Sequence, residues 1–342
     1  MTAHSTIGAP PTVAHGGRLD AARRLYPDAP QPWIDLSTGV NPRAYPLPQL
    51  ADEVFTRLPD DDAFAALESA ARRNYGVPAG VDIVAGGGTQ AFIQLLPSVF
   101  PAKRVAVLGF AYAEHAACWA ASGARVDVVE TSDGLADADA AVIVNPNNPD
   151  GRLLEPEEIL SAASRMSQRD RLLIVDESFM DFTPEHSVAR FANDKALVVL
   201  RSFGKAYGLP GVRLGFALSS RTRAAKLRAA LGPWAVSGPA LFIGACALAD
   251  GAWRASAVQA AARDAARLDA LLTQAGFQIA GGAALFRLAA HPQAARWFAR
   301  LASRGILTRA FAEKPDWLRF GLPGNEAAWS RLAEALESVD GG

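Results

Sequence analysis

The chain has 342 residues, of which 50% are apolar and 20% are charged, the composition of a globular protein with a substantial buried core. Its formal net charge of −1 provides no positive field for holding nucleic acid or an anionic membrane. Cys118 and Cys246 are too few for a disulfide framework, and neither has the neighbours of a metal site. We therefore expect no metal, no nucleic acid and no membrane partner, and two buried thiols in a reducing compartment.

The hydropathy pattern contains neither a membrane span nor a leader. No apolar stretch reaches the roughly twenty residues that a bilayer-spanning helix requires. Residues 1–17 lack a charged stretch followed by an apolar one, which is the pattern of a signal peptide. These two observations predict a cytoplasmic protein.

Apolar and amphipathic segments alternate along most of the chain. The first forty-odd residues are rich in Pro and Gly and hold one predicted helix, 19–25. From residue 46, apolar runs of strand length alternate with Ala-rich helical segments, which indicates an α/β domain with a mainly parallel sheet covered on both faces. The predicted strands are 104–110, 125–129, 141–145, 172–176, 197–202 and 213–218, and the predicted helices are 63–75, 89–100, 113–121, 156–167 and 220–231.

The pattern changes after about residue 232. A long helical segment rich in Ala and Arg, 255–275, precedes short predicted strands at 286–289 and 317–321 and a last helix at 327–339. We therefore predict a large α/β domain over 46–231 and a smaller α+β domain formed by 1–45 plus 232–342.

A Gly-rich loop with one lysine follows the apolar strand that ends at Ser202. A lysine in a partly desolvated site has a lowered pKa and forms an imine with an aldehyde. Ser202 and Arg213 on either side of Lys205 offer a hydroxyl and a fixed positive charge, both suited to a phosphate. Taken alone, the segment is better explained as a surface loop with a solvated lysine, so its interpretation depends on the other motifs.

Polar residues also follow two other predicted strands. The sequence NPNNPDG at 145–151 has the composition of a turn. Ligands in open α/β sheets bind beyond the carboxyl ends of strands, where Asn148 would offer its amide to an oxyanion. Asp176 ends another apolar strand, and a buried carboxylate needs a partner. A protonated pyridine nitrogen, a helix N-terminus and an arginine all remain open as that partner.

A third polar segment, Gly86-Gly87-Gly88-Thr89-Gln90, opens a predicted helix. Glycines let the backbone approach a ligand closely, and the free N–H groups of a first helical turn bind anions. Gly-rich loops are common, so this segment matters because Ser202 and Arg213 form a second candidate phosphate-binding element.

The order of these motifs resembles that of fold-type I pyridoxal-phosphate enzymes of the aspartate aminotransferase superfamily, over nearly the whole chain. The shared order is a Gly-rich turn, an aromatic residue, NPNNPxG, D-E-x-[FY], S-x-x-K and an arginine eight residues after the lysine. Within that superfamily the chain is most similar to threonine-phosphate decarboxylases of cobalamin biosynthesis and next to histidinol-phosphate aminotransferases. The finer similarity rests on HGG at 15–17, DLSTGVNP at 35–42 and RSFGK at 201–205.

The resemblance implies a fold-type I architecture with a large seven-stranded-type sheet, and roles for individual residues. Lys205 is implied to be the Schiff-base lysine and proton shuttle, Asp176 to pair with the pyridine nitrogen, and Asn148 to bond the ring hydroxyl oxygen. Tyr112 is implied to stack on the ring, and His115 to support Asp176. The residues implied to hold the cofactor phosphate are Gly88, Thr89, Gln90, Ser202 and Arg213.

The resemblance also implies a substrate site. Arg319 matches the arginine that binds the substrate α-carboxylate, while Arg309 and His15 match positions near a distal phosphate. A surface arginine remains the alternative for Arg309, and a disordered N-terminal arm the alternative for His15. The remaining residues implied to contact substrate are Val40, Asn41 and Asn148.

Two positions depart from the pattern. Phe179 stands where many aminotransferases have a Tyr that also bonds the ring oxygen. Leu58-Pro59 stands where aminotransferases of this group have a Tyr-Pro pair that reaches the phosphate of the neighbouring subunit. The expectation of a homodimer therefore rests on the general habit of the fold.

The resemblance implies decarboxylation of L-threonine O-3-phosphate to (R)-1-aminopropan-2-yl phosphate. A histidinol-phosphate or related class I/II aminotransferase is the alternative, because Arg319 could fix a carboxylate in either orientation and the sequence does not decide which α-bond breaks. A third hypothesis, a pyridoxal-phosphate-sensing regulator, requires a basic helix-turn-helix domain, and the sequence shows none.

Overall fold

The computed structural model describes residues 16–337, and the contacts between Cα atoms divide the chain into two compact units. Unit 1 comprises Met1–Pro42 and Ala260–Gly342, and unit 2 comprises Arg43–Gln259. The boundary at which the chain returns from unit 2 to unit 1, between Gln259 and Ala260, lies inside the continuous helix α10 (Gly251–Gln274). The sequence predicted domains at 46–231 and at 1–45 plus 232–342. These limits concern domains and not contact units, so they stay a prediction.

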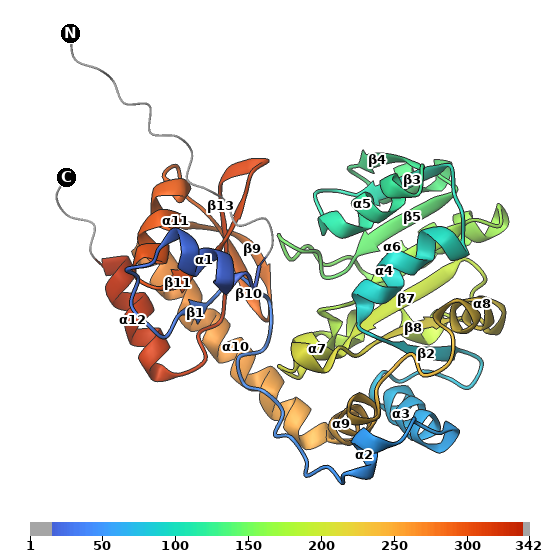
Figure 1. Cartoon of the computed structure of the whole chain (residues 1–342). Coiled ribbons are helices and arrows are strands. Elements are labelled where there is room, and N and C mark those ends of the chain that lie inside the picture. Colours follow the sequence, from blue (N-terminus) through green and yellow to red (C-terminus); the bar gives the residue numbers. More distant parts are fainter. Residues whose placement is uncertain (1–15, 338–342) are drawn as a thin grey trace. The chain divides into compact units, whose positions relative to one another are not determined.

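Unit 2 is built on a seven-stranded sheet with the strand order β2-β8-β7-β6-β5-β3-β4 (Figure 1). Strands β7, β6, β5, β3 and β4 pair in parallel, whereas β8 is antiparallel to both β7 and β2. This is the mainly parallel α/β fold that the alternating segments predicted. The strands are β2 (Asp82–Gly86), β3 (Arg104–Leu108), β4 (Arg125–Val129), β5 (Ala140–Val144), β6 (Leu172–Asp176), β7 (Leu197–Ser202) and β8 (Gly215–Ser219).

Helices cover both faces of this sheet, which explains why its strands are continuous apolar runs. One core contains Leu67 of α3, with residues from α6 and α9, and the other contains Phe92 of α4, with residues from α5 and α8. The α-helices of unit 2 are α2 (Glu53–Thr56), α3 (Asp61–Asn74), α4 (Thr89–Val99), α5 (Ala113–Ala121), α6 (Pro156–Gln168), α7 (Phe203–Ala206), α8 (Arg221–Leu231) and α9 (Gly238–Ala249). Short 3-10 helices lie at Ser132–Asp137, Met180–Phe182, Pro184–His186, Ala189–Phe191 and Pro210–Val212.

Unit 1 contains a four-stranded antiparallel sheet with the order β12-β13-β10-β9 and a parallel pair, β1-β11. The two short strands and the last helix expected near the C-terminus are present. The elements of unit 1 are α1 (Leu19–Leu25), β1 (Ile34–Asp35), β9 (Gln278–Ala283), β10 (Phe286–Ala290), α11 (Ala294–Ser303), β11 (Ile306–Leu307), β12 (Arg309–Phe311), β13 (Lys314–Gly321) and α12 (Glu326–Glu337), together with the later part of α10.

The register of three strands assembles one edge of the large sheet. Gly215, the first residue of β8, is the Cα partner of Gly86 at the end of β2 and of Ser202 at the end of β7. The Gly-rich turn and the lysine loop, which are far apart in the sequence, therefore meet at this edge. Strand β2 was not predicted from the sequence, because its last residue belongs to the Gly-rich segment 86–90, which was predicted to open a helix.

Within residues 16–337, no single helix is long and apolar enough to cross a membrane. Among these residues, only α9 and α10 taken together would be long and apolar enough to span a bilayer, and these two helices are bent by 77° at their junction.

We predict that Gly215→Ala destabilises the protein, because the added Cβ would lie 2.5 Å from the backbone nitrogen of Thr89. Backbone atoms in a packed core move at a cost, so we expect a loss of about 1–3 kcal/mol in the free energy of unfolding. Urea unfolding measures it. The matched control is Gly211→Ala, where nothing lies within 4 Å of the added Cβ. An equal effect of both substitutions would contradict the close approach at Gly215.

Candidate functional site

Asp176 is the buried carboxylate at the end of the central strand β6, with 3% of its surface exposed. Its Oδ2 lies 2.9 Å from Nε2 of His115, which is itself 1% exposed on α5. Its Oδ1 accepts hydrogen bonds from the backbone N–H of Ser178, at 3.0 Å, and from the Ser178 hydroxyl, at 2.5 Å. The carboxylate is thus oriented by three donors, and the expectation that His115 backs Asp176 has a direct geometric counterpart.

These contacts decide the charge of Asp176. Burial acts to raise the pKa of the Asp176 carboxyl, but the hydrogen bonds and charge of His115 and the two hydrogen bonds from Ser178 hold that pKa below its ordinary value. A carboxylate that stays ionised in a buried position can stabilise a positive charge placed beside it.

The loop after β5 places Asn148 by using its other asparagines as structural groups. Asn145 accepts a hydrogen bond from the Leu154 N–H at 2.8 Å and donates to the Leu154 carbonyl at 3.2 Å. The amide of Asn147 donates to the Phe110 carbonyl at 3.0 Å and to Asp150 at 2.8 Å. Asn148 is half-buried at the same edge of the sheet as Asp176, because Val144 and Asp176 are Cα partners on neighbouring parallel strands.

Backbone and side-chain groups that can bind an anion come together where β2, β7 and β8 meet. Gly88 has φ +87°, a conformation that favours glycine, and it precedes α4, whose first turn has no side-chain cap among the described residues. A Cβ on Gly88 would lie 3.0 Å from the guanidinium of Arg213. Ser202 is buried at the end of β7, directly beside Gly215 in the register. Uncapped N–H groups, a hydroxyl and a guanidinium fit a phosphate group.

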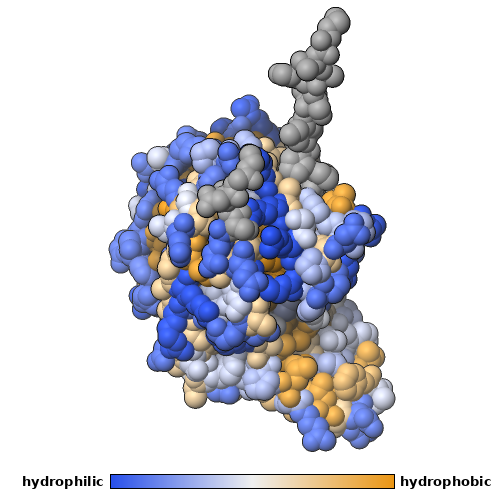
Figure 2. Space-filling view, turned by 90° about the vertical axis from the view of Figure 1, so that its left-hand side faces the viewer, coloured by the Kyte–Doolittle hydropathy of each residue, from blue (hydrophilic) through white to orange (hydrophobic). Residues whose placement is uncertain are grey.

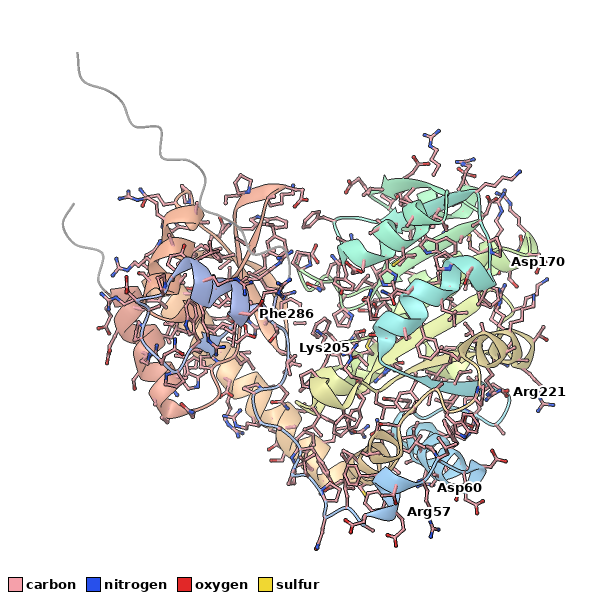
Figure 3. All side chains as sticks on the ribbon, viewed as in Figure 1. Arg57, Asp60, Asp170, Lys205, Arg221 and Phe286 are labelled. Carbon is pink, nitrogen blue, oxygen red and sulfur yellow. The ribbon has the colours of Figure 1, made fainter. Side chains whose placement is uncertain are left out.

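Lys205 lies on α7, at the edge of the sheet where β6 and β7 end (Figure 3). Asp170 and Arg221 mark the opposite edge in the same view. Lys205 is half-buried, and its Nζ lies 5.4 Å from the centroid of the Phe179 ring. The lysine loop taken alone favoured a solvated surface lysine, and the other motifs favoured a Schiff-base lysine; the structure places this amine beside an aromatic ring at the polar edge of the sheet.

The side chain of Gln90 bonds protein groups. Its Nε2 donates to Oε2 of Glu114 at 2.8 Å, and its Oε1 accepts from the Tyr112 hydroxyl at 3.3 Å. Any contact of Gln90 with an anion would therefore involve its backbone N–H. Glu114 and Ser178 were not singled out from the sequence, and only the packing of α4 against α5 and the turn after β6 reveals their contacts.

In unit 1, Arg319 is 7% exposed on β13, and its Nη2 donates to the Ser37 carbonyl at 2.7 Å. Its guanidinium lies 5.2 Å from the centroid of the Phe286 ring. Arg309 on β12 is the Cα partner of Arg319, so both side chains leave the same face of this sheet. Two guanidinium groups on one face can receive two anionic groups of one molecule.

The remaining sequence-predicted substrate residues are in the segment that follows β1. Asn41 is buried and Val40 is half-buried. His15 lies outside the described residues. The structure thus brings the predicted cofactor residues together in unit 2 and places Arg309 and Arg319 side by side in unit 1.

Comparisons with known proteins identify the family of the chain. A family model described as "Aminotransferase class I and II" matches residues 32–336. The threonine-phosphate decarboxylase of Pseudomonas aeruginosa is 44% identical over 327 residues, covering 95% of this chain and 97% of the relative. That of Sinorhizobium sp is 44% identical over 335 residues, covering 96% and 98%. The structure of histidinol-phosphate aminotransferase from Sinorhizobium meliloti in complex with pyridoxal-5′-phosphate superposes with a TM-score of 0.79 at 20% identity, covering 99% and 100%, and shows the shared fold.

We predict that Ser178→Ala lowers the free energy of unfolding of the cofactor-free protein by about 1–2 kcal/mol at neutral pH, because a charge-assisted hydrogen bond is lost. The pKa of Asp176 is depressed in the folded state, so its stabilisation is present above the unfolded value of about 3.9 and is lost as the pH falls through the folded value. The substitution raises the folded pKa. The difference between parent and variant should therefore shrink on acidification below about pH 4.

Urea unfolding across this pH range tests the expectation. The matched control is Ser98→Ala, which removes an exposed hydroxyl bonded to the Leu95 carbonyl and should change stability by less than about 0.5 kcal/mol. A Ser178 effect of the same size at neutral and acid pH would mean that the hydroxyl acts through packing and not through the carboxylate.

Proposed function

The chain belongs to the aminotransferase class I and II family, whose members act with pyridoxal 5′-phosphate, and from this premise we propose that it decarboxylates L-threonine O-3-phosphate to (R)-1-aminopropan-2-yl phosphate. The observation that carries the proposal is the nearly full-length similarity to two threonine-phosphate decarboxylases. The reaction would belong to cobalamin biosynthesis.

The cofactor, when bound, supplies an aldehyde that takes up the substrate amine and a pyridine ring that withdraws electrons from the α-carbon. Asp176 would hold a proton on the ring nitrogen, because its low pKa keeps the carboxylate charged. His115 and Ser178 would fix the orientation of that carboxylate. Asn148 would donate its amide to the ring hydroxyl oxygen, and Tyr112 would cover one face of the ring.

The groups at the ends of β2 and β7 would hold the cofactor phosphate. Backbone N–H groups of Thr89 and Gln90 in the first turn of α4 would donate to the phosphate oxygens, and Gly88 would allow the close approach. The Ser202 hydroxyl and the Arg213 guanidinium would complete the set. Lys205 would hold the cofactor covalently and then move a proton at the substrate α-carbon.

The two arginines of unit 1 suit a substrate with two anionic groups. Arg319 would bind the α-carboxylate, since it is buried and already oriented by the Ser37 carbonyl. Arg309, its partner on the neighbouring strand, would bind the phosphate ester. Val40, Asn41 and His15 would complete this site, and a phosphorylated amino acid has the required pair of anions.

We also propose a homodimer formed through unit 2. Five large apolar side chains in α2 and α9, or close to these helices in sequence, are between 43% and 67% exposed, and exposed apolar patches mark interaction surfaces. Figure 2 shows apolar surface gathered in the lower part of the molecule, at the level of α2 and α9 in Figure 1. Sedimentation velocity tests for the dimer. The five residues are Leu47, Phe55, Leu58, Trp234 and Phe242.

The function is tested by incubating the cofactor-loaded protein with L-threonine O-3-phosphate and no 2-oxo acid, while CO₂ and the amine product are followed. We expect sustained turnover that is lost in Lys205→Ala together with the visible absorption band of the bound cofactor. Lys195→Ala, a substitution distant from this site, should retain both. Conversion of the cofactor to its amine form without CO₂ would instead identify an aminotransferase, with histidinol phosphate as the first substrate to test.

The roles of the two arginines can be separated with the reaction product, which keeps the phosphate and lacks the carboxylate. Arg319→Ala should raise KM for L-threonine O-3-phosphate roughly 10- to 100-fold, the loss of one charge-assisted hydrogen-bonded pair, and leave inhibition by the product nearly unchanged. Arg309→Ala should weaken the binding of both the substrate and the product, because both contain the phosphate. Steady-state kinetics with product inhibition distinguishes the two, and equal effects of both substitutions on product inhibition would contradict the assignment.

A further inference from the structure

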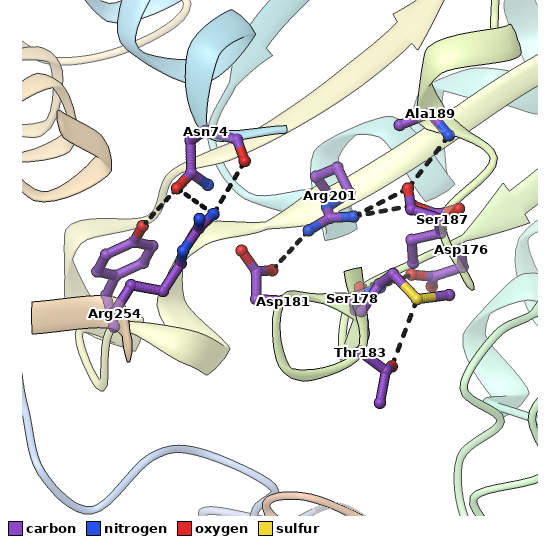
Figure 4. A network of polar contacts seen from close by, with 12 residues as sticks. Asn74, Asp176, Ser178, Asp181, Thr183, Ser187, Ala189, Arg201 and Arg254 are labelled. Carbon is purple, nitrogen blue, oxygen red and sulfur yellow. Dashed lines mark hydrogen bonds and ion pairs between the residues drawn. The ribbon is translucent and has the colours of Figure 1, made fainter. Parts of the chain in front are cut away.

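A cluster of charged side chains is buried behind the cofactor-binding edge of the large sheet (Figure 4). Arg201 is 2% exposed, and its Nη1 lies 2.9 Å from Oε2 of Glu177. Its Nη2 lies 3.1 Å from Oδ2 of Asp181. Both carboxylates are buried as well. The proposed mechanism uses none of these three groups.

The alternation of side chains along β6 and β7 places Glu177 and Arg201 on the face opposite Asp176 and Ser202. Asp176 is the Cα partner of Leu200, so Asp176, Leu200 and Ser202 project from one face of the sheet. Leu200 belongs to the core beneath α4 and α5. Glu177 follows Asp176 and Arg201 precedes Ser202, so the side chains of Glu177 and Arg201 project from the other face.

The backbone pairing between β6 and β7 ends just before Glu177 and Arg201. Its last Cα pair is Asp176 with Leu200, after which Glu177 N–H donates to the Leu200 carbonyl at 2.9 Å. Arg201 and Ser202 pair only with the other neighbour, β8. Beyond this hydrogen bond, the ion pair between Glu177 and Arg201 connects the ends of β6 and β7 at the point where the two candidate cofactor contacts emerge.

Additional contacts fix the position of both partners. The Glu177 carboxylate accepts from the Ser187 hydroxyl at 2.6 Å and from the Val188 N–H at 2.7 Å. The Arg201 guanidinium lies 4.4 Å from the centroid of the Tyr75 ring. Burial acts to lower the pKa of Arg201, but Asp181 and Glu177 raise it above its ordinary value, so the guanidinium stays charged.

Buried ion pairs are poor stabilisers, because desolvation offsets most of their attraction, and apolar residues of similar volume often replace them without loss of stability. In this protein, the contribution of the buried ion pair is to fix the positions of the ends of β6 and β7. We propose that Glu177 and Arg201 are positioning residues that set the separation between Asp176 and Ser202. Since these are the residues proposed to hold the pyridine and phosphate ends of the cofactor, the inference rests on the proposed function.

The test removes the charges and keeps the volume. The triple variant Glu177→Leu, Arg201→Met, Asp181→Leu should melt close to the parent, and should bind pyridoxal 5′-phosphate about 10- to 100-fold more weakly, the size of effect that a small misplacement of two contacts causes. Inorganic phosphate, which engages only the Ser202 end, should keep its dissociation constant within about twofold, because the phosphate-binding surface itself is unchanged.

Arg228→Met is the matched control. Arg228 also pairs with two carboxylates, Glu68 and Asp82, but it lies where β2 begins, at the opposite edge of the sheet. Its removal should leave the dissociation constants of both ligands unchanged. Arg201→Lys keeps the charge but not the planar fork that reaches two carboxylates, and should weaken cofactor binding without affecting phosphate.

Two results would overturn the inference: cofactor affinity equal to that of the parent in the triple variant, or an equal loss of affinity for cofactor and phosphate. If the triple variant does not fold, Arg201→Lys decides by the same two criteria. The readout is binding, so the inference survives if the parent binds the cofactor but does not decarboxylate. A parent that does not bind the cofactor would refute the proposed function first.

Discussion

The reversed direction of β8 is the constraint on which the candidate site in unit 2 depends. In a purely parallel sheet, only carboxyl ends of strands would meet at the binding edge. Because β8 is antiparallel, its amino end lies there too, and Gly215 pairs with Gly86 and Ser202. The absence of a side chain at Gly215 leaves room for the first residues of α4, and Arg213, two residues earlier, lies against Gly88. The candidate phosphate site is a consequence of this single register.

The buried carboxyl groups on the two faces of the sheet have pKa values shifted in opposite directions. On one face, Asp176 keeps a low pKa because hydrogen bonds from His115 and Ser178 outweigh its burial. On the other face, burial raises the pKa of Glu177 although Arg201 acts against it. Adjacent residues of one strand thus have opposite electrostatic environments. The first suits contact with a cationic ring, and the second suits a fixed structural connection.

The two units divide the proposed task. Unit 2 contains Lys205 together with the proposed ring contacts and the proposed phosphate-binding residues, and unit 1 contains the paired arginines on β12 and β13. The helix α10 continues from one unit into the other without a break.

The sequence by itself determined the fold class and the principal candidate residues. Lys205 and Asn148 follow apolar strands and Asp176 ends one, each within a distinctive motif, and such motifs are local features of the chain. It could not reveal β2, the orientation of Gln90 towards Glu114, or the pairing of Arg309 with Arg319. These depend on strand register and helix packing between segments that are distant in sequence. Only the tertiary structure decided them, because a register fixes which side chains share a face, and no single segment contains that information.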